Sequence, residues 1–338
     1  CRQKQAYKQL WGVFGMAQSR QPKKIIMWAL TYDCNASCEY CYLKDYVKPH
    51  KELNKTDCFK IAEKIVENEN WRPQAIWLTG GEPTILSFLP ELVRYFQQNG
   101  IQCVINTNGI IDDVKLDSLL NSEPKGLVVS IDAVSHKTES LKRSYSYDDL
   151  KAKIAKIASN KKNYTILGAA TVISKYNIGG LYEYAKEMQE IGVDYISLNP
   201  MHGEENDDLN ATADCLKKQL TDIKRFLRIK LPDNLYLEMI SNLYGVTNDN
   251  DFEVLCPALE DYFFISPWGY IYPCSNEGWQ KFDSLKFNLL NSKDWYLDIQ
   301  NITSTVGWKR STKSNCFGDR CVGCFKLYYD TVFTGDDF

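Results

Sequence analysis

Three cysteines lie close together near the start of the chain, in the stretch CNASCEYCYL. Cys34, Cys38 and Cys41 follow the spacing Cys-x3-Cys-x2-Cys. A structural zinc ion is usually held by four protein ligands, whereas a four-iron four-sulfur cluster is held by cysteine thiolates. Three thiols therefore favour a cluster in which one iron has no protein ligand and can bind a substrate or cofactor directly. Zinc completed by a distant fourth residue is the alternative.

Apart from Cys1, the remaining cysteines fall into two sets. A second group lies in the last third of the chain and consists of Cys256, Cys274, Cys316, Cys321 and Cys324. The others, Cys58, Cys103 and Cys215, stand in apolar or helical surroundings, where we expect buried thiols. Bunched thiols in a large chain favour metal binding in a reducing compartment over disulfides, which predicts a cytoplasmic protein.

The composition narrows the possible partners. The chain has 338 residues, of which 44% are hydrophobic, so it can bury a substantial core. Its 40 lysines and arginines nearly balance its 43 acidic residues, which argues against nucleic acid or an anionic membrane as the main partner. No apolar run has the length of a membrane-spanning helix. We therefore predict neither nucleic acid nor membrane as a partner.

Short apolar runs alternate with helical patterns along the first two thirds of the chain. Buried strands are expected over residues 24–31, 75–80, 102–107, 126–132, 165–173 and 194–200. Helices are expected over residues 57–69, 88–100, 147–160, 180–192 and 213–227, the first with Thr56 as its N-cap. This alternation predicts an α/β fold with a parallel sheet, either a partial barrel of six units or a doubly wound sheet.

The pattern changes after about residue 235. The stretch YFFISPWGYIYP predicts a β-hairpin with residues 267–269 in its turn, and helical and loop segments follow. We expect three parts: an extension over residues 1–23, an α/β core over 24–235, and a smaller cysteine-rich domain over 236–338.

Polar motifs follow the predicted strands at the sheet edge where parallel α/β folds carry their chemistry. They are CNASCEYC (34–41), TGGEP (79–83), NTNG (106–109), SID (130–132) and LKR (141–143). With these motifs in this order, residues 24–235 resemble the radical S-adenosylmethionine (SAM) superfamily. The resemblance implies a partial (β/α)6 barrel similar to a TIM barrel, and it makes the zinc alternative for the first cysteine group less favourable.

The resemblance also implies a reaction. In that family, SAM chelates the open iron of the cluster. An electron from the cluster then cleaves SAM to a 5′-deoxyadenosyl radical, which abstracts a hydrogen atom from the substrate. The cluster would receive its electron from a reductant such as a flavodoxin or ferredoxin.

Roles for individual residues follow from the matching motifs. Cys34, Cys38 and Cys41 would ligate the cluster, Tyr40 and Leu198 would lie against the adenine, and Gly80 and Gly81 would allow close approach of the backbone. Glu82 would bind the methionine ammonium, Ser130 and Arg143 the methionine carboxylate, and Asp132 the ribose hydroxyls. Strand-end capping by Ser130 and Asp132, and a solvated Arg143, are the alternatives.

The cysteine-rich tail resembles the SPASM and twitch subgroup, whose members carry auxiliary clusters. Its five cysteines are fewer than a full SPASM domain needs, which implies the twitch form with one four-iron auxiliary cluster. The ligands would be Cys256, Cys274, Cys321 and Cys324. Cys316 is left over as a buried thiol, a substitute ligand or a residue of a second site. Zinc also remains open for the tail, because four thiolates satisfy it.

A fully ligated auxiliary cluster can accept an electron from a substrate radical, which favours net oxidation. We therefore expect oxidative modification of a peptide or protein side chain. The alternatives are oxidation or rearrangement of a small molecule, such as a sugar or cofactor precursor, and a non-catalytic iron–sulfur protein. His202 follows the sixth predicted strand and is a weak candidate for a catalytic acid or base.

Overall fold

A computed structural model describes the protein over residues 24–41, 43, 50–132, 142–143, 146–162, 165–200, 213–231, 259–273, 275 and 287–305. Six residues with predicted or open roles lie outside the described residues: Cys256, Cys274, Cys316, Cys321, Cys324 and His202. For Arg143 only the backbone is described.

A nine-stranded sheet forms the centre of the fold. Its parallel part consists of β1 Ile25–Thr31, β3 Ala75–Gly80, β4 Gln102–Thr107, β5 Gly126–Ser130, β7 Ile166–Ile173 and β8 Tyr195–Pro200. These strands are neighbours in chain order, and all pairs are parallel. A doubly wound sheet would reverse its order at a switch point, so the sequential order identifies a partial barrel. All six predicted strands are confirmed.

The strands are parallel and central because they are apolar on both faces. All seven residues of β1 are buried, as are the first four of β3 and of β5. Strands of this kind need cover on both sides, which helices on one side and the barrel interior on the other supply.

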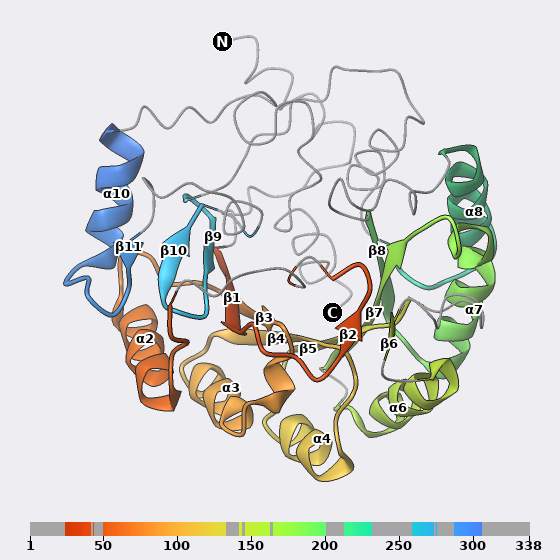
Figure 1. Ribbon diagram of the computed structural model, residues 1–338, viewed down its shortest axis with the longest axis horizontal. Coiled ribbons are helices and arrows are strands. Elements are labelled where there is room, and N and C mark those ends of the chain that lie inside the picture. The colour runs from red at the N-terminus through yellow and green to blue at the C-terminus, as the bar shows by residue number, and fades with distance from the viewer. Residues whose placement is uncertain are drawn as a thin grey trace.

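The helices form an outer arc around the curved sheet (Figure 1). They are α2 Lys55–Glu67, α3 Leu89–Gln98, α4 Asp113–Leu120, α6 Tyr147–Asn160, α7 Leu181–Ile191 and α8 Ala213–Phe226, with short 3-10 turns η1 Pro83–Ile85 and η2 Ile178–Gly180. Each α-helix from α2 to α7 buries an apolar stripe in the common core. The five predicted helices are confirmed, with ends that differ by up to two residues.

Two details of the helices differ from the prediction. The assignment of Thr56 as N-cap is wrong: α2 begins at Lys55, and Asn54 Oδ1 accepts a hydrogen bond from Asp57 N at 3.0 Å. Both residue types cap helices well, so the choice between them was open in the sequence. Helix α4 was not predicted, because its eight residues are too few for a clear helical period.

The predicted hairpin extends the barrel sheet. Strands β9 Tyr262–Ile265 and β10 Tyr270–Tyr272 pair antiparallel, as predicted, and β11 Phe287–Asn288 pairs with β10. β9 in turn pairs parallel with β1. Helix α10 Trp295–Thr305 follows. The sheet is thus continuous from the barrel into the hairpin, and the domain boundary near residue 235 stays a prediction.

Side-chain contacts also tie the C-terminal segments to the barrel. Lys64 Nζ of α2 donates to the main-chain oxygens of Leu289, Leu290 and Ser292 at 2.7–2.9 Å. Trp71 Nε1 donates to the main-chain oxygen of Glu260 at 2.7 Å.

No helix among the described residues is both long enough and apolar enough to cross a membrane.

Candidate functional site

The loop that carries the three cysteines starts directly after β1 and is joined to the end of β3. Gly81 N donates to Thr31 O at 2.7 Å, and Glu82 N donates to Asp33 O at 2.9 Å. The two acceptors, Thr31 and Asp33, belong to the short segment that leads into Cys34. The Gly-Gly-Glu motif and the cysteine loop therefore form one connected backbone unit at the carboxyl edge of the sheet.

The two glycines make this junction possible. A Cβ atom built at Gly80 would lie 2.1 Å from Thr31 O, and one built at Gly81 would lie 2.3 Å from Asp33 O. Gly80 also has a φ of +142°, which side chains of L-residues disfavour. The two glycines therefore allow the backbone of Thr31 and Asp33, which leads into the cysteine loop, to approach closely. Close approach of a cofactor to these glycines stays a prediction.

Replacing Gly80 with alanine is expected to lower the free energy of unfolding by about 3 kcal/mol, because backbone strain adds to an overlap with main-chain oxygen. Urea denaturation measures the change. Gly179→Ala is the matched control, since no atom of the described residues lies within 4 Å of a Cβ there and its φ is not positive. Equal losses in the two variants would contradict the close packing at Gly80.

Glu82 is fully buried and serves as the acceptor for four hydrogen bonds. Its Oε1 accepts from Thr84 N at 3.0 Å, from Thr84 Oγ1 at 2.6 Å and from Thr107 Oγ1 at 2.9 Å. Its Oε2 accepts from Asn108 N at 2.6 Å. Burial raises the pKa of Glu82 above its ordinary value, and these hydrogen bonds oppose the rise. The carboxylate is thereby fixed between the ends of β3 and β4.

The side chain of Asn108 connects this carboxylate to the cysteine loop. Asn108 Nδ2 donates to Asn35 Oδ1 at 2.7 Å and to Cys34 Sγ at 3.6 Å. Asn35 Nδ2 donates in turn to Ile110 O at 2.7 Å. The structure thus brings Cys34 and Glu82 together through one residue of the NTNG motif. Sequence reasoning noted this motif but gave no role to its residues or to Thr84.

The three loop cysteines differ from the other described cysteines in exposure. Cys34 is exposed, Cys38 and Cys41 are partly exposed, and none of them is in a disulfide. Cys58 and Cys103 are buried, as predicted, whereas Cys215 is partly exposed. Across the described residues, no three Cys, His, Asp or Glu side chains converge as a metal site. The fit of the loop to an iron–sulfur cluster therefore rests on the donor type and on the place of the loop in the fold.

Alkylation of the metal-free protein is expected to modify Cys34, Cys38 and Cys41 and to spare Cys58 and Cys103. Burial, with help from Asp57 and Glu52, raises the pKa of Cys58 to about 12, and burial raises the pKa of Cys103 as well. Both thiols are therefore protonated and inaccessible. Peptide mass spectrometry after iodoacetamide treatment reads the result, and urea-unfolded protein is the control. Modification of Cys58 in folded protein as fast as that of Cys34 would contradict the described packing.

A small second sheet places Lys142 and Arg143 of the LKR motif beside the cysteine loop. Strand β2 Ser37–Cys38 pairs antiparallel with β6 Lys142–Arg143, with Ser37 opposite Arg143. The backbone of Arg143 therefore lies next to the cysteine loop, and its predicted role toward the methionine carboxylate stays a prediction. In the same loop, Tyr40 Oη is buried and has no hydrogen-bond partner among the described residues.

The other predicted residues lie on neighbouring strands. Ser130 is the last residue of β5 and is partly exposed. Asp132 is 4% exposed, and its Oδ1 accepts from Val172 N at 2.7 Å. Asp132 thus supports the end of β7, as the strand-end alternative foresaw, and a role toward ribose stays a prediction. Leu198 is fully buried in β8.

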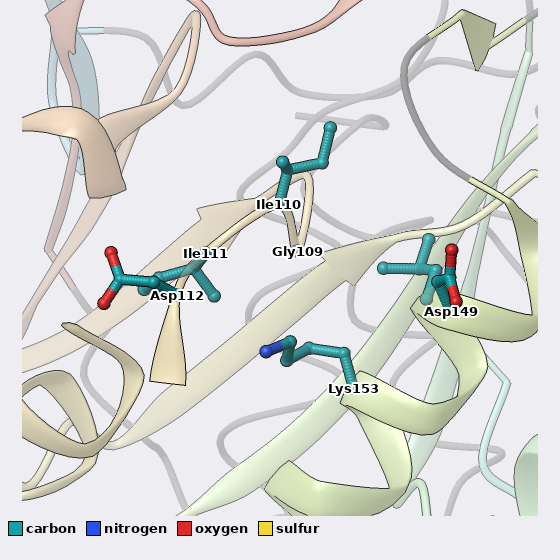
Figure 2. A pocket seen from close by; sticks show the side chains of 7 residues that line it. Gly109, Ile110, Ile111, Asp112, Asp149 and Lys153 are labelled. Carbon is teal, nitrogen blue, oxygen red and sulfur yellow. The ribbon is translucent and has the colours of Figure 1, made fainter. Parts of the chain in front are cut away.

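A pocket of about 320 Å³ lies between the turn after β4 and the first turns of α6 (Figure 2). Its lining residues are Gly109, Ile110, Ile111, Asp112, Asp149, Leu150 and Lys153. None of them belongs to the predicted cluster or SAM residues. Lys153 Nζ pairs with Asp113 Oδ1 at 2.6 Å, so its charge is already partnered. This pocket adjoins the site built around Cys34 and Glu82, because Ile110 accepts a hydrogen bond from Asn35 and donates one to Asn108.

A comparison with protein families decides the identity of this site. The model of the radical SAM superfamily matches residues 28–178, a range that contains the cysteine loop, the Gly-Gly-Glu motif and the strand ends described above. Residues 28–178 of the chain therefore belong to the radical SAM superfamily of enzymes. Membership in this superfamily implies a four-iron four-sulfur cluster and SAM as cofactors. The thiol loop and the buried acceptor at Glu82 fit both of these groups chemically.

Two curated relatives of this radical SAM chain match over different lengths. A putative glycyl-radical enzyme activating enzyme of Methanocaldococcus jannaschii is 33% identical over 148 residues, which are 44% of this chain and 49% of the relative. A probable GTP 3′,8-cyclase of Saccharolobus islandicus is 26% identical over 244 residues, which are 65% of this chain and 75% of the relative. The chain thus spans about half the length of the first of these relatives.

Among solved structures, SuiB of Streptococcus suis bound to the precursor peptide SuiA is similar in fold. The TM-score is 0.66 at 18% sequence identity, over 86% of this chain and 67% of that chain. The likeness supports the same architecture, a mixed α/β fold with the parallel sheet of a partial TIM barrel and C-terminal antiparallel strands.

Proposed function

We propose that this radical SAM protein binds a cluster and SAM at the Cys34–Glu82 site and modifies its substrate by hydrogen-atom abstraction. When bound, these cofactors would supply reductive cleavage of SAM to a 5′-deoxyadenosyl radical. The observation that carries the proposal is the link from Cys34 through Asn108 to Glu82, with distances of 3.6 Å and 2.6 Å. It joins a cluster ligand and an acceptor for the methionine ammonium in one rigid arrangement.

Glu82 is suited to receive the ammonium group of SAM. Its Oε1 already accepts three hydrogen bonds, whereas Oε2 accepts one, from Asn108 N. Oε2 therefore has acceptor capacity left. A buried carboxylate lacking an opposite charge is costly, so an incoming ammonium would favour its ionised form and be bound strongly in return.

The remaining roles follow the motifs. Cys34, Cys38 and Cys41 would ligate the cluster, and Ser130 with Arg143 would hold the methionine carboxylate. Tyr40 and Leu198 would lie against the adenine, and Asp132 would bind the ribose hydroxyls. The pairing of β2 with β6 supports the assignment for Arg143, because it holds the two segments together.

We further propose that the tail carries one auxiliary cluster, ligated by Cys256, Cys274, Cys321 and Cys324. With four thiolate ligands it would have no open iron, so it would accept an electron from the substrate radical. A reductant such as a flavodoxin or ferredoxin would supply the first electron to the other cluster. The net result would be oxidation of the substrate.

The substrate class that we favour is a peptide or protein side chain. The fold of the chain is similar to that of SuiB, whose structure holds a precursor peptide. A small molecule is the second candidate, favoured by the match to a probable GTP 3′,8-cyclase, of which this chain covers 75%.

The test begins with anaerobically reconstituted protein, dithionite and SAM. Liquid chromatography with mass detection follows 5′-deoxyadenosine, first alone and then with short peptides encoded beside the gene or with GTP. Release of 5′-deoxyadenosine that rises with a peptide, together with a peptide lighter by a pair of hydrogens, supports the first candidate. A rise with GTP alone supports the second, and no release at all would mean an iron–sulfur carrier.

A further inference from the structure

The side chain of Asn108 is held in one orientation by the turn after β4. Its Oδ1 accepts from Ile110 N at 2.8 Å, so the oxygen faces the turn and the amide nitrogen faces the cysteine loop. That nitrogen donates to Asn35 Oδ1 at 2.7 Å and to Cys34 Sγ at 3.6 Å. The backbone N–H, by contrast, donates to Glu82. One residue thus supports a thiol with its side chain and a carboxylate with its main chain.

We propose that Asn108 is a positioning residue whose side-chain amide donates to the sulfur of Cys34 and thereby raises the reduction potential of the cluster. The proposal rests on the function proposed above, because it takes Cys34 as a cluster ligand. It adds a specific means by which this chain sets how easily its cluster accepts an electron.

The direction of the effect follows from charge. Reduction adds one negative charge to the cluster and its thiolates, and an N–H group that points at a ligand sulfur stabilises that charge. Cys34 Sγ accepts a second such bond from Ala36 N at 3.3 Å, which comes from its own loop. Removing the Asn108 donor should therefore lower the potential without removing every donor to this sulfur.

A second explanation is that Asn108 merely holds the loop through Asn35. The two explanations can be tested separately, because the contact with Asn35 and the contact with Cys34 can be removed by different substitutions. Asn35→Ala removes the bond between the two asparagines and the bond to Ile110 O, and it leaves the amide of Asn108 free to donate to Cys34. Asn108→Ser removes both contacts of the amide but keeps a hydroxyl that can accept from Ile110 N in the same turn.

The experiment is a redox titration of the full chain followed by electron paramagnetic resonance. The signal that disappears in Cys34→Ala protein identifies the cluster of this loop. Asn108→Ser is expected to reduce the equilibrium constant for reduction about tenfold, which is ~59 mV for a one-electron couple. Asn35→Ala is expected to change it by less than about twofold. SAM binding by Asn108→Ser should persist, because the backbone bond to Glu82 remains.

Asn108→Asp, which has the same shape but lacks the amide donor, is a second variant in case the Asn108→Ser protein binds the cluster poorly. Its equilibrium constant for reduction should fall at least as far. An unchanged potential in both variants would overturn the inference, as would an equal shift in Asn35→Ala. So would loss of the cluster from both variants in folded protein, because Asn108 would then build the site and not tune it. A parent protein that loads no cluster would instead overturn the proposed function itself.

Discussion

Changing Cys34, Cys38 and Cys41 together to alanine is expected to abolish SAM cleavage and to halve the iron content. With two four-iron clusters the parent protein should hold about eight irons after anaerobic reconstitution, and the variant about four. The reason is that the loop would lose all of its thiolate donors, while the tail cysteines would be unchanged. Iron analysis and 5′-deoxyadenosine release measure the two effects.

Two matched variants make this result interpretable. Cys321→Ala with Cys324→Ala should also lower the iron to about four but should still release 5′-deoxyadenosine. Cys215→Ala removes a partly exposed thiol of α8 and should change neither quantity. Zinc in place of iron in the parent protein, or continued SAM cleavage by the triple variant, would refute the assignment of the loop. Circular dichroism checks the fold of each variant, since cluster loss can also remove folding energy.

Replacing Glu82 with alanine is expected to prevent measurable SAM binding and to lower the free energy of unfolding by about 3 kcal/mol. The loss of stability is large because the four donors from Thr84, Thr107 and Asn108 would lose their buried acceptor. Equilibrium dialysis with labelled SAM and urea denaturation give the two measurements.

Glu82→Gln separates the charge from the shape. The amide keeps one oxygen for the donors at Oε1 but loses the negative charge, so SAM affinity should fall about tenfold to a hundredfold, as expected for a hydrogen bond to a charged group. Glu91→Gln is the control, because Glu91 is exposed and pairs with Lys55 on the surface. Equal affinity in Glu82→Gln and parent protein would show that the carboxylate does not bind the ammonium.

The pH dependence of stability gives an independent reading of the same carboxyl group. Its pKa in the folded protein without SAM is raised above the ordinary value of 4.5, chiefly by burial. The folded state therefore binds the proton more tightly than the unfolded state does. The resulting contribution to stability is complete below the ordinary pKa and is lost as the pH rises through the raised one. Glu82→Gln protein should lack this decline, which urea denaturation at a series of pH values would detect.

The strands and the motif positions could be predicted from the sequence because each depends on local pattern. Runs such as residues 25–30 are apolar throughout, and a polar motif soon after such a run marks the carboxyl edge of a parallel sheet. The order of the strands in the sheet could not be predicted in the same way. A partial barrel and a doubly wound sheet share the same alternation of strands and helices.

The contacts that build the site could not be predicted from the sequence, for a different reason. Thr107 and Asn108 reach Glu82 only because β4 lies beside β3 in the sheet. The steric need for Gly80 arises from the backbone of β1, a neighbour far away in the chain. Such requirements are set by tertiary packing and leave no periodic signal.

The parallel pairing of β9 with β1 has a consequence for how the molecule is made. β1 is synthesised long before β9, because Tyr262, the partner of Ile25, lies far downstream of it in the sequence. Until β9 arrives, a strand whose seven residues all become buried is an open edge, which other chains can pair with. Such distant pairing is slow to form. The outer edge of β1, the strand that leads into the cysteine loop, is thus among the last edges of the sheet to be paired. Slower synthesis or chaperones should therefore reduce aggregation during expression.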